Sequence, residues 1–309
     1  MKVTIVGAGF YGSTLAQRVA QADYAREVVL TDIIEGRPQG LALDIMQSRP
    51  IEGFETRVTG TNGYEETAGS DVCVVTAGVP RKPGMSRLDL LGTNAAIVAG
   101  VTKRLVEGSP DAVLIIVTNP LDEMTALAAA VSGLPRARVM GQAGMLDSAR
   151  FSHFLAERAG VSPSRVEAFT LGSHGDTMVP VPSLARIWGR PLRDVLDDHA
   201  IAEVVARTRD GGAEIVAMLR TGSAYFAPSS AAEAMVRAVA TDTNEVMPVS
   251  AYVHGAYGIS DVWLGVPVRI GREGVREIVE LPLADDELAA LRGAAEAVRS
   301  RQADVAAYQ

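Results

Sequence analysis

The sequence predicts an α/β fold, with a doubly wound parallel sheet in the N-terminal half and a second, α+β domain after it. Short apolar runs over residues 3–6, 71–77 and 112–117 have the continuous character of buried parallel strands. Segments with helical spacing of apolar residues separate these runs. Strands that alternate with helices in this way are typical of parallel sheets with right-handed crossovers.

Residues 2–32 have the pattern strand, turn, helix, strand, and the turn reads Gly7-Ala8-Gly9-Phe10-Tyr11-Gly12. Gly7 permits a tight turn, Gly9 lets the backbone approach a pyrophosphate, and Gly12 lets the helix pack on the strand. Asp32 ends the second strand, where a carboxylate accepts hydrogen bonds from an adenosine ribose and repels a ribose phosphate. The segment therefore predicts a Rossmann domain that binds NAD rather than NADP. The alternative is a glycine-rich turn in an unrelated sheet protein.

Length and composition indicate a globular protein with two lobes, because 309 residues with 48% hydrophobic content exceed one core and can fill two. The formal net charge of −8 argues against nucleic acid or an anionic membrane as a partner. The single cysteine, Cys73, lies in an apolar run, which favours a buried strand residue over a reactive thiol. No leader and no apolar run of membrane length is present, so a cytoplasmic protein is expected.

The remaining N-terminal elements follow in order. Residues 36–49 have helical spacing, and their apolar side, Leu41 to Met46, could cover the core or contact a second subunit. Residues 55–60 form a short strand. After a proline- and glycine-rich loop over 78–86, a long helix carries an apolar stripe, and its start cap is formed by Ser86 and Asp89.

The pattern changes near Gly144, which divides the chain into a nucleotide-binding domain (1–143) and a catalytic, substrate-binding domain (144–309). A helix over 145–159 leads out of the first domain. Beyond it, strands and long helices mix, as expected for an α+β domain. The expected strands are 165–171, 246–253 and 262–270, and the expected helices are 200–219, 229–241 and 285–303.

Three segments carry residues suited to chemistry. Asp147 and Arg150 lie three residues apart on one helix face, and a surface ion pair is the simplest interpretation. His174 lies in the glycine-flanked turn Gly172 to Thr177, although an isolated histidine is more often structural. The segment Arg81-Lys82-Pro83-Gly84-Met85-Ser86-Arg87, taken alone, is a solvated basic loop.

Taken together, these segments resemble the lactate/malate dehydrogenase family over the whole chain. The supporting motifs are Gly7-Ala8-Gly9, Ala77-Gly78, Val117-Thr118-Asn119-Pro120, Leu146-Asp147-Ser148-Ala149-Arg150 and Gly172-Ser173-His174-Gly175-Asp176. The resemblance is closer to the family's malate enzymes whose sequences are similar to lactate enzymes. Arg81 decides this, because the lactate enzymes carry glutamine at the matching position.

The resemblance implies reversible hydride transfer between (S)-malate and NAD, which gives oxaloacetate and NADH. It makes His174 the acid and base and Asp147 the residue that fixes its tautomer. It assigns Arg150 to the carboxylate beside the reacting carbon. Arg87 would polarise the carbonyl from a closing loop, and Arg81 would bind the distal carboxylate that pyruvate lacks.

The resemblance also places Asn94, Val117 and Asn119 along the nicotinamide half of the cofactor, with Asn119 within reach of the substrate. It implies a homodimer or homotetramer and needs no metal. Two alternatives stay open. One is a lactate or other 2-hydroxyacid dehydrogenase, and the other is a non-catalytic dinucleotide-binding sensor, which would keep the glycines but need not keep the residues around His174.

Overall fold

The N-terminal half of the main sheet is parallel and has the strand order β3-β2-β1-β4-β5-β6. The strands are β1 (Lys2–Val6), β2 (Glu27–Thr31), β3 (Arg57–Thr61), β4 (Val72–Val75), β5 (Val113–Ile116) and β6 (Val139–Gly141). This order is that of a dinucleotide-binding doubly wound sheet, which confirms the predicted fold class. The computed structural model describes residues 1–79 and 87–308.

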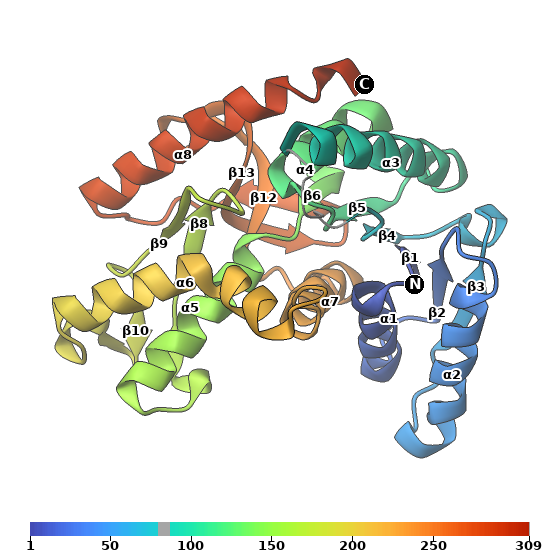
Figure 1. Cartoon of the computed structure of the whole chain (residues 1–309), viewed down its shortest axis with the longest axis horizontal. Helices are drawn as coiled ribbons and strands as arrows, with labels where there is room; N and C mark the ends of the chain where they lie inside the picture. Colours follow the sequence, from blue (N-terminus) through green and yellow to red (C-terminus); the bar gives the residue numbers. More distant parts are fainter. Residues whose placement is uncertain (80–86, 309) are drawn as a thin grey trace.

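Helices cover both faces of this sheet (Figure 1). They are α1 (Phe10–Ala22), α2 (Arg37–Glu52), α3 (Arg87–Gly108) and α4 (Leu121–Ser132). Alternate strand residues face opposite sides, so Val3 and Ile5 join the core under α1 and α2, whereas Val6 joins the core under α3 and α4. Cys73 is buried in the second core, as predicted, and burial raises the pKa of its thiol to about 12.

Helices and antiparallel strands make up the C-terminal half. The helices are α5 (Gly144–Ala159), α6 (Asp198–Leu219), α7 (Phe226–Thr241) and α8 (Asp285–Ala303). The strands are β7 (Val166–Glu167), β8 (Thr170–Gly172), β9 (Met178–Pro180), β10 (Arg186–Ile187), β11 (Arg190–Pro191), β12 (Val246–His254), β13 (Ser260–Gly271) and β14 (Gly274–Ile278). The predicted α+β character of this half is confirmed.

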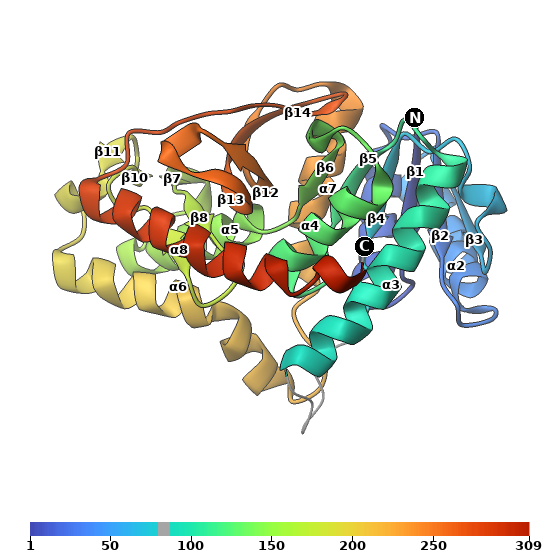
Figure 2. The same ribbon diagram turned by 90° about the horizontal axis from the view of Figure 1, so that it is seen from above.

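Antiparallel pairing joins the two halves into one sheet, because β12 pairs with β6 through Ser250 and Gly141. Helix α7 returns to the N-terminal half and packs on α1, where the Tyr11 hydroxyl donates to the Pro228 carbonyl at 2.8 Å. The bulk of Tyr11 in the glycine turn therefore contacts a second helix. In Figure 2, α8 runs from the C-terminal half toward α3 and α4. Its Arg301 contacts Glu123 of α4 at 2.8 Å.

Two sequence predictions need correction. The strand expected over 165–171 is two short strands, because β7 pairs with β10 in a separate small sheet and β8 pairs with β13. Helix α4 and strand β6 were not predicted at all. Helix α4 is buried around most of its circumference, including Asp122 and Glu123, so it lacks the polar face that reveals an amphipathic helix.

The structure partly answers whether the apolar side of helix α2 covers the core or contacts a second subunit. Ala42 and Ile45 are buried against the sheet and cover the core, whereas Leu43 and Ile51 are exposed.

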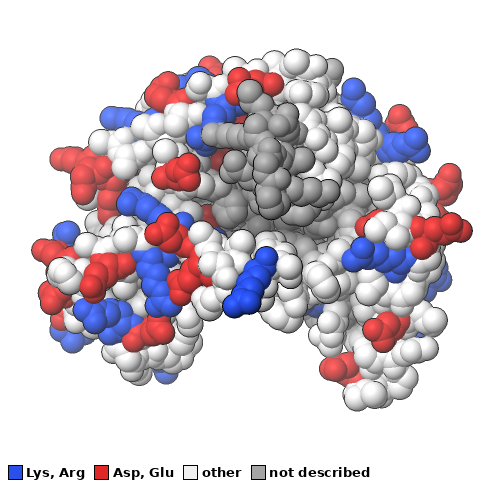
Figure 3. Space-filling model, viewed as in Figure 1, with Lys and Arg blue, Asp and Glu red and all other residues white. Residues whose placement is uncertain are grey.

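None of the helices within residues 1–79 and 87–308 has the length and apolar character that a bilayer crossing requires. Figure 3 shows acidic and basic side chains intermixed on the visible face.

Candidate active site

The glycine turn has the clearances that a dinucleotide site requires. Gly7 has a φ of 107°, and a β-carbon added at Gly12 would lie 1.8 Å from the Gly7 carbonyl oxygen. A β-carbon at Gly9 would meet no protein atom within 4 Å, so this position faces open space. Helix α1 begins directly after Gly9 without a side-chain cap, which leaves its first amides available for an anion. These features fit a bound pyrophosphate.

Asp32 follows the last residue of β2 and lies beside this turn. One carboxylate oxygen accepts a hydrogen bond from the Ala8 amide at 2.6 Å, and the other accepts one from the Ile34 amide at 2.9 Å. The Asn62 side chain donates to the Asp32 carbonyl at 2.6 Å. The carboxylate is therefore held at the edge of the glycine turn, the position at which it would meet the adenosine ribose.

The next strand ends lie at the same edge of the sheet. The Val117 amide donates to the Val75 carbonyl at 2.9 Å, and Asn119 is exposed just beyond β5. Asn94 is buried, and its side-chain amide nitrogen donates to the Asn119 carbonyl at 2.7 Å. Its side-chain oxygen accepts from the Val79 amide at 2.8 Å. Asn94 thus holds two strand-end loops together, and its contact with the cofactor stays a prediction.

His174, Asp147 and Arg150 form one connected unit. His174 Nδ1 lies 2.8 Å from Asp147 Oδ2, and Arg150 Nη1 lies 3.1 Å from Asp147 Oδ1. Asp147 is 1% exposed on α5, while His174 lies in the loop between β8 and β9. The sequence predicted that these residues act together, and the structure brings them into direct contact. The ring's other nitrogen is left free of Asp147 for proton transfer.

The surroundings of His174 act on its pKa in opposite directions. Burial of the ring lowers the pKa, because it disfavours the charged form. The charge of Asp147 and its hydrogen bond raise it, and the charge of Asp122 adds to this effect. The net result is a pKa above the ordinary 6.5. The imidazole therefore holds its proton at neutral pH more readily than an exposed histidine does.

The Arg150 side chain packs against two glycines in α6, most closely at Gly211. A β-carbon at Gly211 would lie 3.3 Å from Arg150 Cδ, and one at Gly212 would lie 3.5 Å from Arg150 Nη2. Glycines inside a helix normally reduce its stability, and the close contact with Arg150 is a packing reason for the glycine at 211. A glycine inside a predicted helix was the sequence signal for this close contact.

Asp122 was also missed, because it lies in the unpredicted helix α4. It is 2% exposed, and its carboxylate accepts hydrogen bonds from the His174 amide at 2.9 Å and from the Ser250 hydroxyl at 2.8 Å. An acid two residues after Pro120, at a sheet edge where ligands bind, was the available signal.

Two predicted arginines have no described side chain. Arg81 lies outside the described residues, and Arg87 is the first residue of α3 but its side chain is not described.

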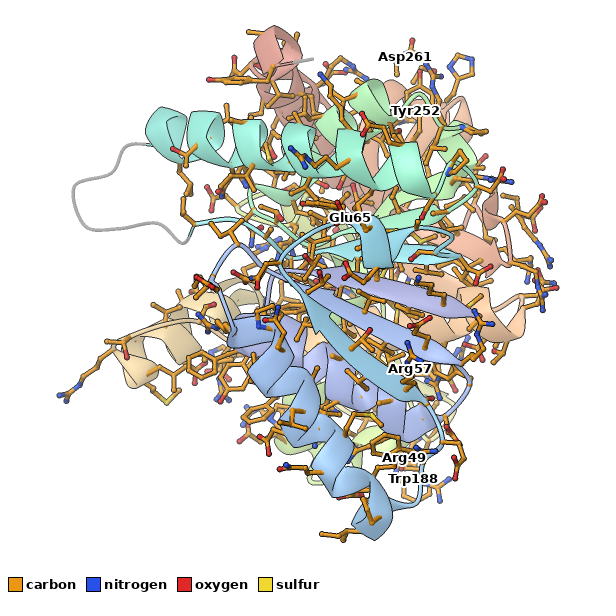
Figure 4. The ribbon with its side chains drawn as sticks, turned by 90° about the vertical axis from the view of Figure 1, so that its right-hand side faces the viewer. Arg49, Arg57, Glu65, Trp188, Tyr252 and Asp261 are labelled. Carbon is orange, nitrogen blue, oxygen red and sulfur yellow. The ribbon has the colours of Figure 1, made fainter. Side chains whose placement is uncertain are left out.

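A further pair of titratable side chains lies on β12 and β13. Tyr252 and Asp261, which lie near one another in Figure 4, form a hydrogen bond of 2.5 Å on the exposed ends of β12 and β13.

Comparison with known proteins identifies the family. The family model for the lactate/malate dehydrogenase NAD-binding domain matches residues 1–141, and that for the α/β C-terminal domain matches residues 144–309. The chain is 52% identical over 299 residues to a malate dehydrogenase of Chloroherpeton thalassium, which covers 97% of this chain and 96% of the relative. The chain belongs to the lactate/malate dehydrogenase family. The resemblance on which the sequence analysis relied is confirmed.

Solved structures of both branches of the lactate/malate dehydrogenase family are similar to this chain. A malate dehydrogenase from Salinibacter ruber has a TM-score of 0.95 and 49% identity, over 99% of this chain and 97% of that one. A lactate dehydrogenase from Cryptosporidium parvum, complexed with lactic acid and NAD, has a TM-score of 0.94 and 40% identity, over 98% and 97%. The shared backbone does not separate the two activities, so side chains must do so.

Proposed function

We propose that this chain catalyses the reversible, NAD-dependent oxidation of (S)-malate to oxaloacetate. The observation that carries the proposal is the contact between His174, Asp147 and Arg150 in a chain whose N-terminal domain is an NAD-binding domain. The malate dehydrogenases that match nearly the whole chain at about half of its positions support it. The remaining steps follow from the chemistry of the side chains.

The residues that would hold NAD are those of the glycine turn and Asp32. The open position at Gly9 and the uncapped start of α1 suit the pyrophosphate, and Asp32 suits the ribose hydroxyls. Bound NAD supplies the acceptor for the hydride that leaves the alcohol carbon. We place the Val117 and Asn119 backbone beside the nicotinamide half, and Asn94 behind them.

His174 removes the hydroxyl proton of malate and returns it to the carbonyl oxygen of oxaloacetate in the reverse direction. Asp147 binds Nδ1, so Nε2 is the nitrogen that faces the substrate oxygen and changes its protonation state. When the ring is protonated, the Asp147 carboxylate stabilises the imidazolium at a distance of 2.8 Å.

Arg150 is the anchor for the carboxylate next to the reacting carbon. Its guanidinium presents paired donors in one plane, and its contact with Asp147 fixes one end of that plane. We assign Arg87 to the carbonyl oxygen, where a cation stabilises developing negative charge. We assign Arg81 to the distal carboxylate. Both roles come from the family resemblance.

Arg81 separates this proposal from lactate or other 2-hydroxyacid dehydrogenation. A dicarboxylate neutralises both Arg81 and Arg150, whereas a monocarboxylate leaves Arg81 without a partner in a desolvated site. The loss of that pairing costs roughly a few kcal/mol. The alternative of a non-catalytic sensor gives no reason for a buried Asp147 that is bonded to both His174 and Arg150.

We further propose that the protein is a cytoplasmic homodimer or homotetramer. We place the boundary between its two domains at Gly144. The exposed Leu43 and Ile51 on α2 support association, because both are large apolar side chains directed away from the chain's own core. Light scattering of the purified protein tests the assembly.

The direct test of the function is an absorbance assay with oxaloacetate and pyruvate, each with NADH and NADPH. We expect oxaloacetate with NADH to give the highest initial rate, and pyruvate to be at least about 100-fold slower. A higher rate with pyruvate would assign the chain to the lactate branch. NADH binding without turnover of either keto acid would support the sensor.

A further inference from the structure

We propose that Asp122 is a second carboxylate that serves His174: it positions the histidine through its backbone amide and adds negative charge that favours the imidazolium. The inference rests on the proposed function in giving His174 the proton-transfer role. It goes beyond that function in assigning part of the histidine's geometry and charge to a residue of α4.

The geometry of Asp122 connects three separate segments. Asp122 Oδ2 accepts a hydrogen bond from the His174 amide at 2.9 Å, and Oδ1 accepts one from the Ser250 hydroxyl at 2.8 Å. Asp122 lies in the first turn of α4, and Ser250 is fully buried on β12. The carboxylate therefore ties the His174 loop to a helix of the NAD-binding half and to the central strand pair.

The His174 loop has a glycine on each side of the histidine, so a contact at the His174 backbone helps to fix its conformation. Gly172 has a φ of 81°, and Gly175 lies on the other side of the histidine. Asp147 contacts the imidazole at Nδ1 and not the backbone of the loop. Within the loop, the Ser173 and Thr177 hydroxyls lie 2.8 Å apart and the Met178 amide donates to the Gly175 carbonyl at 3.0 Å. Asp122 fixes the backbone at the same residue. Two carboxylates on two helices thus determine both where His174 lies and how its ring turns.

The charge of Asp122 also acts on the ring. Burial raises the pKa of Asp122 to about 6, and the hydrogen bonds from His174 and Ser250 act against that rise. Both of its oxygens accept hydrogen bonds, an arrangement that favours the ionised carboxylate despite its burial. In that state it raises the pKa of His174 in the same direction as Asp147 does.

Other charged groups near this pair have known partners. Arg150, from α5, lowers the pKa of His174 and is bonded to Asp147. Glu123, next to Asp122 on α4, raises the pKa of Asp122 and is paired with Arg301 of α8 at 2.8 Å. Arg150 is thus paired with Asp147, and Glu123 with Arg301. Among the described residues, Asp122 forms no ion pair with an arginine or lysine, so its charge acts on the imidazolium.

Two substitutions separate the two roles of Asp122. Asp122→Asn keeps an oxygen that accepts from the His174 amide but removes the charge. Asp122→Ala removes both. We expect both variants to lower the pKa of His174 by about 0.5 to 1. We expect kcat/KM for oxaloacetate to fall several-fold in Asp122→Asn and at least about 30-fold in Asp122→Ala, because only the second variant frees the loop.

Glu287→Gln is the matched control. Glu287 is also a buried carboxylate that accepts hydrogen bonds from a backbone amide and a serine hydroxyl, both of Ser183, but it lies at the start of α8. Its substitution should lower the melting temperature without changing the pKa of His174. This control separates a general loss of buried hydrogen bonds from a specific effect on the imidazole.

The pKa of His174 is measured by NMR of the intact protein with isotope-labelled histidine, in the absence of substrate. The sequence has four histidines, and the signal lost in His174→Gln assigns the resonance. An unchanged pKa in Asp122→Asn would overturn the electrostatic role. Equal kcat/KM in Asp122→Asn and Asp122→Ala would overturn the positioning role. Because the titration needs no turnover, failure of the wild type to reduce oxaloacetate would count against the proposed function alone.

Ser250→Ala provides a second route if neither Asp122 variant folds. It keeps the carboxylate but removes the hydroxyl donor at 2.8 Å, which disfavours the ionised form of Asp122. We expect a smaller fall in the pKa of His174, in the same direction. A pKa equal to that of the wild type in this variant would overturn the electrostatic role of Asp122.

Discussion

Asp147 and His174 are 27 residues apart in sequence, yet their side chains meet at 2.8 Å between Oδ2 and Nδ1. The carboxylate is buried and also contacts Arg150 at 3.1 Å. One acid thus orients both the proton-transfer group and the substrate anchor.

Asp147→Asn should remove most of the activity while the protein remains folded. The amide keeps the size of the side chain but loses the charge that stabilises the imidazolium and orients Arg150. We expect kcat/KM for oxaloacetate to fall by about 10²- to 10⁴-fold. Steady-state kinetics, with circular dichroism as a check of folding, measures the effect. A loss of less than about threefold would show that Asp147 does not serve His174.

The two reaction directions should respond to pH in opposite ways. Oxaloacetate reduction needs the protonated His174, and malate oxidation needs the neutral ring. Because the pKa of His174 lies above its ordinary value, reduction should continue above pH 6.5 and then decline, while oxidation rises over the same range. Profiles of kcat/KM against pH for both directions test this. Profiles that rise and fall together would contradict the assignment.

Gly12→Ala and Gly9→Ala should differ in a way that only the dinucleotide site explains. The new methyl group at Gly12 would meet the Gly7 carbonyl oxygen at 1.8 Å, so both the melting temperature and the affinity for NADH should fall. At Gly9 no protein atom lies within 4 Å, so only the affinity should fall. Thermal melts and NADH fluorescence titrations measure both. Normal NADH binding by Gly9→Ala would place the pyrophosphate elsewhere.

Glu123→Gln should reduce stability, because Glu123 is 3% exposed at its side chain and pairs with Arg301 of α8 at 2.8 Å. Loss of the charge leaves a partly buried guanidinium, at a cost of about 2–3 kcal/mol. Glu296→Gln, which breaks the exposed pair with Arg299, should cost less than about 0.5 kcal/mol. Denaturant unfolding compares them. Equal losses would show that α8 is not held through this pair.

Much of the fold could be predicted because local patterns and tertiary packing agree. Strands β4 and β5 are apolar on both faces, and helix α3 buries the predicted Leu91, Ala95 and Val98. Helix α4 was not predictable in this way, since burial on nearly all sides removes the periodic signal.

The candidate site also contains residues that the sequence could predict and residues that it could not. His174, Asp147 and Arg150 lie in motifs whose order is informative, so their association could be inferred from the sequence. The partners of Asp122 could not be inferred, because they are a backbone amide and a serine hydroxyl from distant segments. Every residue except proline has a backbone amide, so the identity of the donor residue does not reveal such a hydrogen bond.

The ratio of kcat/KM for oxaloacetate to that for pyruvate, in the wild type and in Arg81→Gln, is the sharpest test of the proposed specificity for malate and oxaloacetate. We expect the wild type to prefer oxaloacetate strongly. In the variant, oxaloacetate reduction should fall by about 100-fold or more and pyruvate reduction should rise, because the cation for the distal carboxylate is gone. A ratio that stays the same in Arg81→Gln would contradict the account.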